Sequence, residues 1–437
     1  MAVHGSDHAA GTVGHPMRTV HAALARLHGG GSVELRGGTY HRRITLAHVR
    51  DVTLRPYRHE HVVLSGAGLH APKGFSAMVQ IRDSRNVTVR GLDVTAYRTK
   101  RRGVVPIGIY VHGHDHGVRI AGNHVHDLGN DNGTLGSFDI NAHGIAVYGD
   151  DPDAAVSGLH IVDNTVDRLH LGASETVVVN GNVDGWDIAR NHIFDDNNIG
   201  IDAIGFEPTL GGKNRYTQRN RARNGHITRN VVSGIKSRGN PAYWEGDGWC
   251  NCADGIYVDG GTHIDIRDNK VSTSDIGIEV AAENPRGAAD HVRVLHNRIR
   301  GSLYVGLTTG GYCNGADACG GVNTGKSFDN LFADNDLRDD NGLNDGSPEL
   351  LVQYYASRDV FEHNTITATN TGGVVYGTVP DAQAYTGPDA NRSDHNAFAV
   401  AKGHAVQFGW NGHVYGSFAA YRQATHQDAH SRLVFRA

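Results

Sequence analysis

Short segments that alternate in residue type recur along the chain and predict β-strands. Between Asn197 and Glu207, the side chains of Ile199, Ile201 and Ala203 fall on one face and those of the residues between them on the other. A period of two residues is that of a strand and not of a helix. Six other segments share this pattern: IGIYVHG from Ile107, HGIAVYG from His143, ETVVVNG from Glu175, DGIYVDG from Asp254, IGIEVAA from Ile276 and VGLTTGG from Val305.

A second recurring feature is an asparagine that follows a short apolar stretch. It occurs at Asn123, Asn164, Asn191, Asn230, Asn269, Asn297, Asn335 and Asn364, at intervals of 27 to 41 residues. The shorter intervals are those of a repeat architecture, and the longer ones indicate the same unit with an inserted loop. Such a short unit buries its apolar face only by stacking on its neighbours, and an Asn at one place in every turn can then form a hydrogen-bonded ladder.

This pattern resembles the right-handed parallel β-helix repeats of pectate-lyase-like, carbohydrate-active proteins. The resemblance covers roughly residues 37 to 379, and the phrases IGIDAIGFE and DGIYVDGG are similar to those of secreted bacterial members. It implies an all-β fold, a single-stranded right-handed parallel β-helix solenoid, and a poly- or oligosaccharide as the substrate class.

The domain organisation predicted from these repeats is one long solenoid with a cap at each end. Residues 1–36 are expected to form an N-terminal segment whose helix, between His15 and His28, covers the open edge of the stack. Residues 37–379 form the β-helix, and residues 380–437 form a C-terminal capping segment with a short helix between Ser417 and Gln427.

Composition limits the partners and the compartment. The 41 basic and 46 acidic residues give a net charge of about −5, so no nucleic-acid surface is expected. No stretch approaches the roughly 18 apolar residues of a membrane span. The N-terminal sequence lacks the features of a signal peptide, and the expectation is a secreted protein whose leader has been removed.

Four cysteines suit two disulfides in an oxidising compartment. A bridge between Cys313 and Cys319 is the easiest to close, pairing of these residues with Cys250 and Cys252 across coils is also open, and a four-cysteine zinc site is the competing interpretation.

Aligning the seven strands predicts which side chains lie next to one another outside the core. The fourth-position column reads Tyr110, Ala146, Val178, Asp202, Tyr257, Glu279 and Thr308, and the sixth-position column reads His112, Tyr148, Asn180, Ile204, Asp259, Ala281 and Gly310. Because neighbouring turns are roughly 4.8 Å apart, three carboxylates and a phenol are expected in one patch.

The predicted catalytic residues are Asp202, Glu279, Asp259 and Tyr257. Glycoside cleavage needs one carboxylic acid and one carboxylate, about 5–5.5 Å apart for retention or roughly 6.5–9.5 Å apart for inversion. The columns permit both spacings, and this chemistry requires no cofactor and no metal. The residues predicted to bind substrate are Asn180, His112, His143, Tyr148, Glu175, Glu207, Glu283, Trp244 and Trp249.

Two other functions stay open. In a polysaccharide lyase or uronan epimerase, Asp202, Asp259 and Glu279 would hold Ca²⁺ and Tyr257 or His143 would be the base. The columns contain no Lys or Arg, which favours the hydrolase. A non-catalytic carbohydrate-binding solenoid is the third hypothesis, and the acidic patch argues against it.

Overall fold

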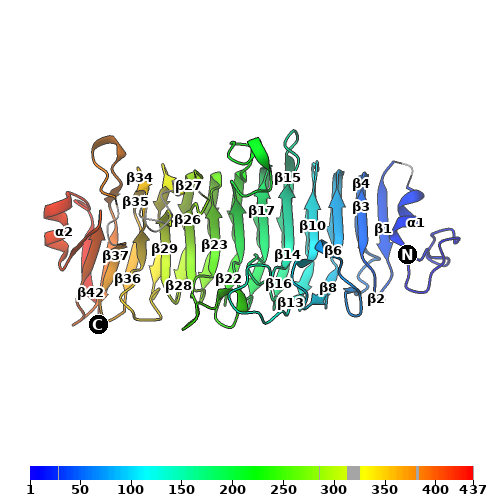
Figure 1. The fold of residues 1–437 in the computed structure, drawn as a ribbon, viewed down its shortest axis with the longest axis horizontal. Coiled ribbons are helices and arrows are strands. Elements are labelled where there is room, and N and C mark those ends of the chain that lie inside the picture. The colour runs from blue at the N-terminus through cyan, green and yellow to red at the C-terminus, as the bar shows by residue number, and fades with distance from the viewer. Residues whose placement is uncertain (28, 285, 313–324, 380–382, 437) are drawn as a thin grey trace. The chain divides into compact units, whose positions relative to one another are not determined.

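The computed structural model describes residues 1–27, 29–284, 286–312, 325–379 and 383–436. The chain forms two compact units. Unit 1 comprises Met1–Asn198 and Arg238–Cys250, and unit 2 comprises Ile199–Ser237 and Asn251–Ala437. Figure 1 shows the strands of each unit in the order of the chain, and each unit is described by itself below.

Unit 1 consists of three parallel sheets, among its described residues, to which each coil contributes one strand in turn. The first sheet contains β1 (Gly31–Leu35), β4 (Arg50–Pro56), β7 (Arg85–Arg90), β11 (Arg119–Ala121), β15 (Val156–Val162) and β18 (Val183–Ala189). The second contains β2 (Gly38–Tyr40), β5 (Val62–Ser65), β8 (Asp93–Thr95), β12 (His124–His126), β16 (Thr165–Asp167) and β19 (His192–Phe194). The third contains β3 (Ile44–Ala47), β6 (Gly74–Arg82), β10 (Val104–His112), β14 (His143–Gly149) and β17 (Val177–Gly181), and a separate pair is formed by β9 (Arg98–Thr99) and β13 (Gly129–Asn130).

Unit 2 repeats this arrangement. Its first sheet contains β21 (Arg223–Thr228), β24 (Thr262–Arg267), β27 (Ala288–Leu295), β31 (Leu331–Ala333), β35 (Val360–Glu362) and β38 (Arg392–Asp394), with β30 (Lys326–Phe328) and β34 (Ala356–Ser357) beside them. Its second contains β22 (Val231–Ser233), β25 (Lys270–Ser272), β28 (Arg298–Arg300), β32 (Asp336–Arg338), β36 (Thr365–Ala368), β39 (Ala397–Ala401) and β42 (Arg432–Arg436). Its third contains β20 (Ile201–Ile204), β23 (Asp254–Asp259), β26 (Ile276–Ala281), β29 (Val305–Gly310), β33 (Leu350–Val352), β37 (Val374–Thr378), β40 (Gln407–Trp410) and β41 (His413–Tyr415).

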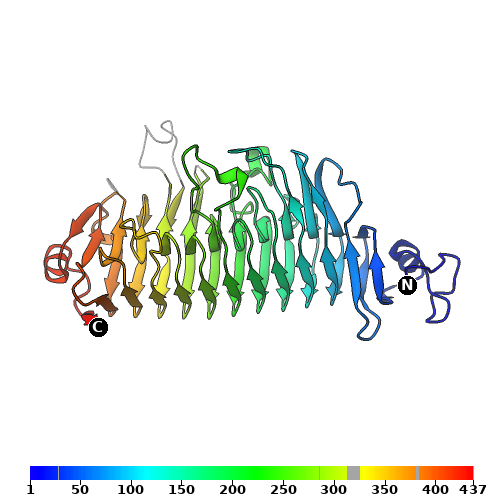
Figure 2. The same cartoon turned by 90° about the horizontal axis from the view of Figure 1, so that it is seen from below.

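Stacked coils of this kind define a parallel β-helix, and the predicted fold class is confirmed. Figure 2 shows the strands of successive coils within each unit lying edge to edge. The inward side chains form the core: Ile109 and Ile145 of unit 1 and Ile256 and Ile278 of unit 2 have no exposed surface. Both faces of these strands are largely buried, so the fold depends on the stack and not on any single coil.

The predicted asparagine ladder is present in both units. In unit 2, the side-chain oxygen of Asn269 accepts hydrogen bonds from the backbone N–H of Asn230 (2.9 Å) and from its Nδ2 (3.0 Å). Asn269 in turn donates from its own N–H (3.0 Å) and Nδ2 (3.0 Å) to Asn297 Oδ1. The residue before the ladder asparagine has a left-handed backbone conformation, as at Asp268 (φ 58°) and His296 (φ 56°). This backbone turn orients the side-chain amide of the asparagine along the stack.

Close packing of neighbouring coils explains the glycines in the Gly-Ile-x-Val segments. A Cβ on Gly277 would meet the backbone oxygen of Gly306 in the next coil and the side chain of Ile299, and Gly255 lies in the same way against the backbone oxygen of Gly277. The coils therefore approach too closely at this position for any side chain.

We expect Gly277→Ala to lower the free energy of unfolding by about 1–3 kcal/mol, because the added methyl group must displace backbone that is held by its neighbours. Urea unfolding followed by circular dichroism measures this loss. Gly301→Ala, where the φ of 68° disfavours alanine but the nearest atom is 3.9 Å away, separates backbone strain from crowding. An equal loss in both variants would contradict the crowding argument.

The helices at the two ends of the chain are shorter than predicted. Helix α1 (Val20–Ala25) begins after Thr19, whose side chain accepts a hydrogen bond from the N–H of Ala22. Helix α2 (Phe418–Thr425) is capped in the same way by Ser417. Short 3-10 helices occupy Gly212–Asn214, Pro241–Tyr243 and Gly387–Asp389.

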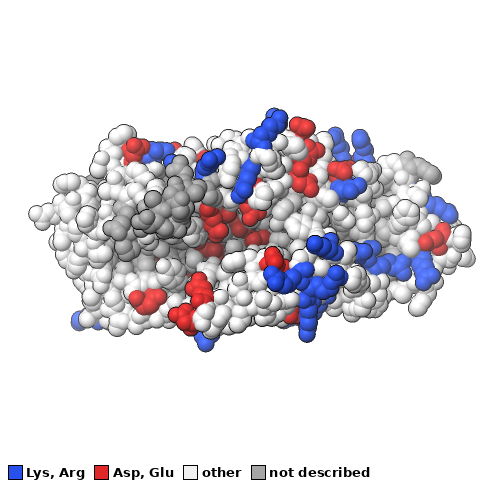
Figure 3. All heavy atoms as spheres, viewed as in Figure 1, with Lys and Arg blue, Asp and Glu red and all other residues white. Residues whose placement is uncertain are grey.

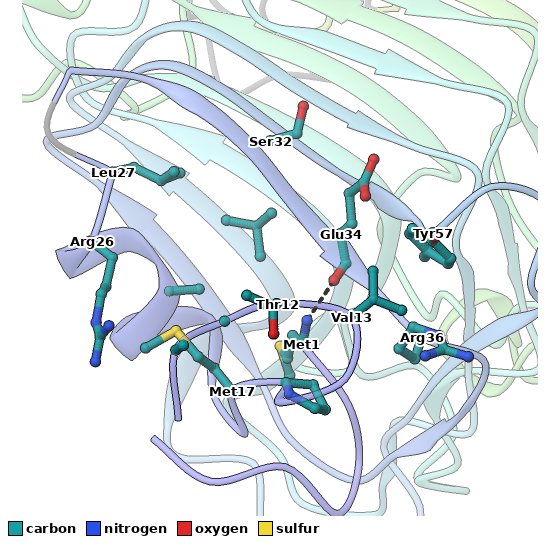
Figure 4. Close-up of a pocket in the computed structure, with 15 residues that line it drawn as sticks. Met1, Thr12, Val13, Met17, Arg26, Leu27, Ser32, Glu34, Arg36 and Tyr57 are labelled. Carbon is teal, nitrogen blue, oxygen red and sulfur yellow. Dashed lines mark hydrogen bonds between the residues drawn. The ribbon is translucent and has the colours of Figure 1, made fainter. Parts of the chain in front are cut away.

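The N-terminal segment closes over the first coil. Figure 4 shows the pocket of about 250 Å³ between this segment, α1 and β1. The α-amino group of Met1 donates a hydrogen bond of 2.7 Å to the backbone oxygen of Glu34 in this strand. Met17 is buried in the same region.

The parallel pairing extends past residue 379, where the β-helix was predicted to end. β38 pairs with β35, β39 with β36 and β40 with β37, all in parallel. The predicted boundary is therefore one coil too early, because the last coil lacks the Gly-Ile-x-Val pattern. The third sheet ends at β41, which pairs antiparallel with β40, and the second sheet ends at β42, which pairs in parallel with β39.

Cys250 and Cys252 are both disulfide-bonded, so they are not zinc ligands. Cys313 and Cys319 lie outside the described residues, and with them the predicted bridge between these two.

Candidate active site

The third sheet of unit 2 brings the predicted fourth-position residues into register. Asp202 on β20 pairs with Tyr257 on β23, Tyr257 with Glu279 on β26, and Glu279 with Thr308 on β29. The side chains of Asp202, Tyr257 and Glu279 are only 1–2% exposed. The alignment of the strands was predicted correctly, and it places the two carboxylates on either side of the phenol.

Asp259 lies in the sixth-position column, as predicted, and its Oδ1 accepts a hydrogen bond of 2.8 Å from the N–H of Glu283. Burial, followed by the charge of Glu283, raises the pKa of Asp259 well above its ordinary value. Ile204, expected beside Asp259, instead forms a bridge with Gly260, so this column is irregular at β20. Figure 3 shows acidic side chains gathered in a hollow near the middle of the face in view.

Asp254 is a further member of this group that sequence reasoning missed. It is the first residue of β23 and is 2% exposed. Its carboxyl is hydrogen-bonded to that of Glu279, while its Oδ1 is buried without a hydrogen-bond partner. Burial, then the charge of Glu279, raises the pKa of Asp254 well above its ordinary value. We refer to Asp202, Asp254, Asp259 and Glu279 as the acidic cluster.

Glu279 is held in the acidic cluster by hydrogen bonds from neighbouring side chains. Its Oε1 accepts hydrogen bonds from the hydroxyl of Tyr312 (2.9 Å) and from Nε2 of Gln353 (3.1 Å). Its Oε2 is buried and has no hydrogen-bond partner. Burial raises the pKa of Glu279 to about 7, and the hydrogen bonds from Tyr312 and Asp254 act against this rise. The hydrogen bond between the two carboxyls requires a proton on one of them, because two carboxylates have no hydrogen to donate.

Two phenols adjoin the acidic cluster. The hydroxyl of Tyr257 donates to that of Tyr312 over 3.3 Å and lies 3.5 Å from Oε1 of Glu283. Burial raises the pKa of Tyr257 well above 10, with neighbouring negative charges acting in the same direction. Tyr257 is therefore held as a neutral phenol, which donates hydrogen bonds and is a poor proton acceptor.

The charged groups that raise the pKa values in the acidic cluster most are negative. For Asp254 and Asp259, every one of the largest charge effects comes from another carboxylate, including Glu207 and Glu283. The nearby cation Arg221 is held elsewhere, because it forms an ion pair of 2.7 Å with Asp290 and donates to the backbone oxygens of Gly260 and Gly261. Such crowding of like charges favours the protonated, neutral form of these carboxyls.

In unit 1, four predicted substrate-binding residues lie on the third sheet. His112 and Tyr148 are half-buried and pair in register on β10 and β14, and Tyr148 pairs with Asn180 on β17. Asn180 has no exposed surface, so its amide does not face solvent. Nδ1 of the buried His143 lies 3.1 Å from the backbone oxygen of Glu175 and 3.4 Å from its carboxylate, and burial lowers the pKa of His143 to about 4.

An aromatic cluster in unit 1 joins two of these residues to two that were not predicted to bind substrate. The ring of Phe75 on β6 packs edge-on against Tyr148 (5.1 Å between centroids) and Tyr110 (5.4 Å), and Tyr110 stacks on His112 (4.5 Å). Phe75 is 44% exposed. An exposed ring with polar neighbours is a surface on which a sugar ring can stack. Phe75 precedes the first of the aligned segments, so the column alignment did not include it.

The remaining predicted residues lie in loops. Trp244 and Trp249 pack against each other in unit 1, with ring centroids 5.1 Å apart, and both are half-buried. Glu207 follows β20 and is half-buried, and Glu283 follows β26 and is exposed. Glu207 and Glu283 thus adjoin the acidic cluster of unit 2, while the tryptophans pack the long loop of unit 1.

The fold and this site define a parallel β-helix protein with a cluster of buried carboxyls. No protein-family model matches the chain. It is 34% identical over 431 residues to "Uncharacterized protein YwoF" of Bacillus subtilis (strain 168), a match that covers 98% of this chain and 85% of YwoF. The chain therefore belongs to the YwoF family.

Solved structures with a similar fold share little sequence with this chain. The GH136 lacto-N-biosidase from Eubacterium ramulus is 12% identical (TM-score 0.49), with 100% of this chain and 66% of that chain covered. The Dettilon tailspike protein (gp208) is 13% identical (TM-score 0.49), with 95% and 64% covered. The A-module of the mannuronan C-5 epimerase AlgE6 of Azotobacter vinelandii is 12% identical (TM-score 0.43), with 86% and 93% covered. This chain spans a little less than two thirds of each of the first two.

Within the described residues, neither helix has the length and apolar character that crossing a membrane requires.

Proposed function

We propose that this protein is an enzyme that cleaves glycosidic bonds of a poly- or oligosaccharide by carboxylate acid/base chemistry at the acidic cluster. The observation that supports this most is the hydrogen bond between Asp254 and Glu279. Both carboxyls are buried, and the pKa of Glu279 is about 7. The pair therefore holds a proton at neutral pH, as a general acid must, while further carboxylates lie beside it.

Each carboxyl of the acidic cluster has its own role in the proposed reaction. Glu279 and Asp254 act as the proton-donating pair, with Glu279 protonating the departing glycosidic oxygen and Asp254 resupplying the proton. Asp202 or Asp259 supplies the carboxylate that activates water or attacks the anomeric carbon. Tyr257 and Tyr312 donate hydrogen bonds within the site. The aromatic cluster of unit 1, with Phe75, is proposed to bind a sugar ring.

The alternative function is a calcium-dependent lyase or uronan epimerase, which the concentration of negative charge favours. The ions that perturb Asp254 and Asp259 most are all carboxylates, and calcium prefers such ligands. However, Asp202, Asp259 and Glu279 are not among the described groups whose donor atoms converge within 4.8 Å. The raised pKa of Tyr257 also disfavours it as the base. We therefore propose that cleavage requires no metal.

Assays on neutral and uronate-containing polysaccharides, with and without EDTA, test the proposal. New reducing ends without the ultraviolet absorbance of an unsaturated uronide, unchanged by EDTA, are expected. An unsaturated product that disappears with EDTA would identify a lyase, and altered uronate stereochemistry without cleavage would identify an epimerase. Binding without any product would identify a carbohydrate-binding protein. Each of these last three results would overturn the proposed hydrolase.

The pH dependence follows from the proton held by the pair. Since the acid must be protonated, kcat/KM is expected to fall as the pH rises past about 7, the pKa of Glu279. Tyr312→Phe removes a hydrogen bond that stabilises the charged carboxylate, so the pKa of Glu279 rises and this alkaline limb moves to higher pH. Tyr304→Phe serves as a control because no hydrogen bond links its hydroxyl to Glu279 among the described contacts. A limb that moves to lower pH would contradict this assignment.

We also propose that the protein is secreted. The disulfide-bonded Cys250 and Cys252 suit an oxidising compartment, and a polymeric carbohydrate substrate would be met outside the cell.

A further inference from the structure

Two histidines and several aspartates converge on the second sheet of unit 1. His124 and His126 occupy alternate positions of β12, so their side chains leave the same face of the strand. Their rings stack with centroids 4.0 Å apart. Asp93 on β8 pairs with His124, and Asp167 on β16 pairs with His126.

The hydrogen bonds in this group run diagonally to the strand pairing. Oδ1 of Asp93 lies 2.8 Å from Nε2 of His126, although its backbone partner is His124. Oδ1 of Asp167 lies 2.5 Å from Nε2 of His124, although its backbone partner is His126. One ring nitrogen of each histidine and one oxygen of Asp93 all lie within 4.8 Å of one another.

A second layer of side chains fixes the first. Nδ1 of His126 lies 2.6 Å from Oδ2 of Asp127, so one carboxylate orients this ring from the side opposite Asp93. Oδ2 of Asp93 is held by Nε2 of His61 at 2.9 Å. Arg168 binds both Asp167 and Asp127. Histidine ligands of metals are typically held in this way, with the second ring nitrogen bound to a carboxylate.

We propose that Asp93, His124 and His126 bind a divalent transition-metal ion, with Zn²⁺ as the probe ion. The inferred ligand atoms are Nε2 of His126, Oδ1 of Asp93 and Nδ1 of His124, because Asp167 engages the other nitrogen of His124. Zinc–ligand bonds of about 2.0–2.2 Å to nitrogen and oxygen place tetrahedral ligands roughly 3.3 Å apart. A small opening of the 2.8 Å contact between Asp93 and His126 reaches this spacing.

Charge and access support the same site. With neutral histidines, Asp93, Asp127 and Asp167 contribute −3 and Arg168 contributes +1, which sums to −2 and matches a divalent cation. The side chain of His124 is 41% exposed, so an ion can reach it, whereas that of Asp167 is fully buried. Imidazole with carboxylate is a ligand set that zinc and related ions prefer.

Two other His–Asp groups of the described residues lack these features. In the group His263, Asp290 and His291, the carboxylate is already engaged by Arg221 and by the hydroxyl of Thr262. In the group Asp394, His395 and His430, both histidine side chains are at least 50% exposed, with no second carboxylate among the donors that converge there. The site on β8 and β12 therefore stands apart from both, and it is independent of the proposed glycosidase function.

The experiment is a Zn²⁺ titration of the full chain by calorimetry, after treatment with EDTA and dialysis. His124→Gln/His126→Gln is expected to abolish the tightest binding site, and His263→Gln/His291→Gln, which alters another stacked histidine pair, is expected to retain it. Asp127→Asn keeps all three ligands and is expected to weaken the affinity about 10–100-fold. Zinc should also raise the unfolding midpoint of the natural sequence and not that of the His124/His126 variant.

Retention of the tight site in His124→Gln/His126→Gln, or its loss in the His263/His291 control, would overturn the proposal, as would the absence of any tight site in the natural sequence. If the double variant fails to fold, Asp93→Asn provides the same comparison, because it removes the ligand charge and keeps the shape of the side chain. Unchanged zinc affinity in a folded Asp93→Asn would equally overturn it. A negative result here leaves the carbohydrate assays unaffected, so the two proposals fail separately.

Discussion

Replacing Glu279 by Gln is expected to lower kcat on the true substrate by about 100-fold to 10,000-fold, the range that a general acid or base contributes. The amide cannot donate the proton that the pair of Glu279 and Asp254 holds near pH 7. The fold should persist, because the amide oxygen still accepts the hydrogen bond from Tyr312. Steady-state kinetics measure the loss, and the unfolding midpoint, measured in parallel, should stay unchanged.

Glu362→Gln is the matched control. Glu362 lies on β35 in the first sheet of unit 2 and is half-buried, and its backbone oxygen accepts a hydrogen bond from the N–H of Asp334. Its kinetics should equal those of the natural sequence. Full turnover by Glu279→Gln would show that this carboxyl is not the acid. Asp202→Asn, expected to be inactive and folded as well, tests the partner carboxylate independently.

Asn269→Ala is expected to lower the free energy of unfolding by about 3 kcal/mol or more, the largest effect on stability that we predict. The substitution deprives Asn230 of the oxygen that accepts its N–H and its Nδ2, and it deprives the backbone oxygen of Ile227 of its donor. These groups are buried, and each costs about 1–3 kcal/mol when left unsatisfied. Urea unfolding monitored by circular dichroism and by tryptophan fluorescence measures the change.

Lys270→Ala controls for a change in the same turn, because Lys270 is exposed beside Asn269. Its effect should stay within about 0.5 kcal/mol. If Asn269→Ala were equally mild, the ladder would not be a main support of the stack. Hydrogen exchange adds detail, since the coils on either side of residue 269 should lose protection before more distant ones, as expected for a repeat protein.

Most of the coil was predictable because its causes are local or periodic. The alternation in DGIYVDG and IGIEVAA identified strands, and the shared pattern aligned Tyr257 with Glu279 correctly. The spacing of Asn269 and Asn297 identified the ladder before any contact was known. The last coil was missed because β40 carries the sequence QFGW and lacks the pattern, yet it still pairs with β37 in parallel.

The candidate site was only partly predictable. Asp202, Tyr257 and Glu279 followed from the register, but Asp254 did not, since it is the first residue of its strand and only two columns were considered. One signal was present: this position is Ile in the next strand, at Ile276, and a carboxylate there is unusual. Tyr312 and Gln353 come from outside the aligned columns, and nothing in their local sequence indicates contact with Glu279.

The sequence by itself determined the repeat, the strands and the alignment of the carboxylates, because periodic apolar positions and the asparagines leave one way to stack the coils. Only the tertiary structure decided which of these acids have raised pKa values. That depends on burial, on the hydrogen bond between Asp254 and Glu279, and on donors from distant segments. The diagonal contacts of His124 and His126 with the aspartates were decided in the same way, since side-chain direction, and not register, brings these atoms together.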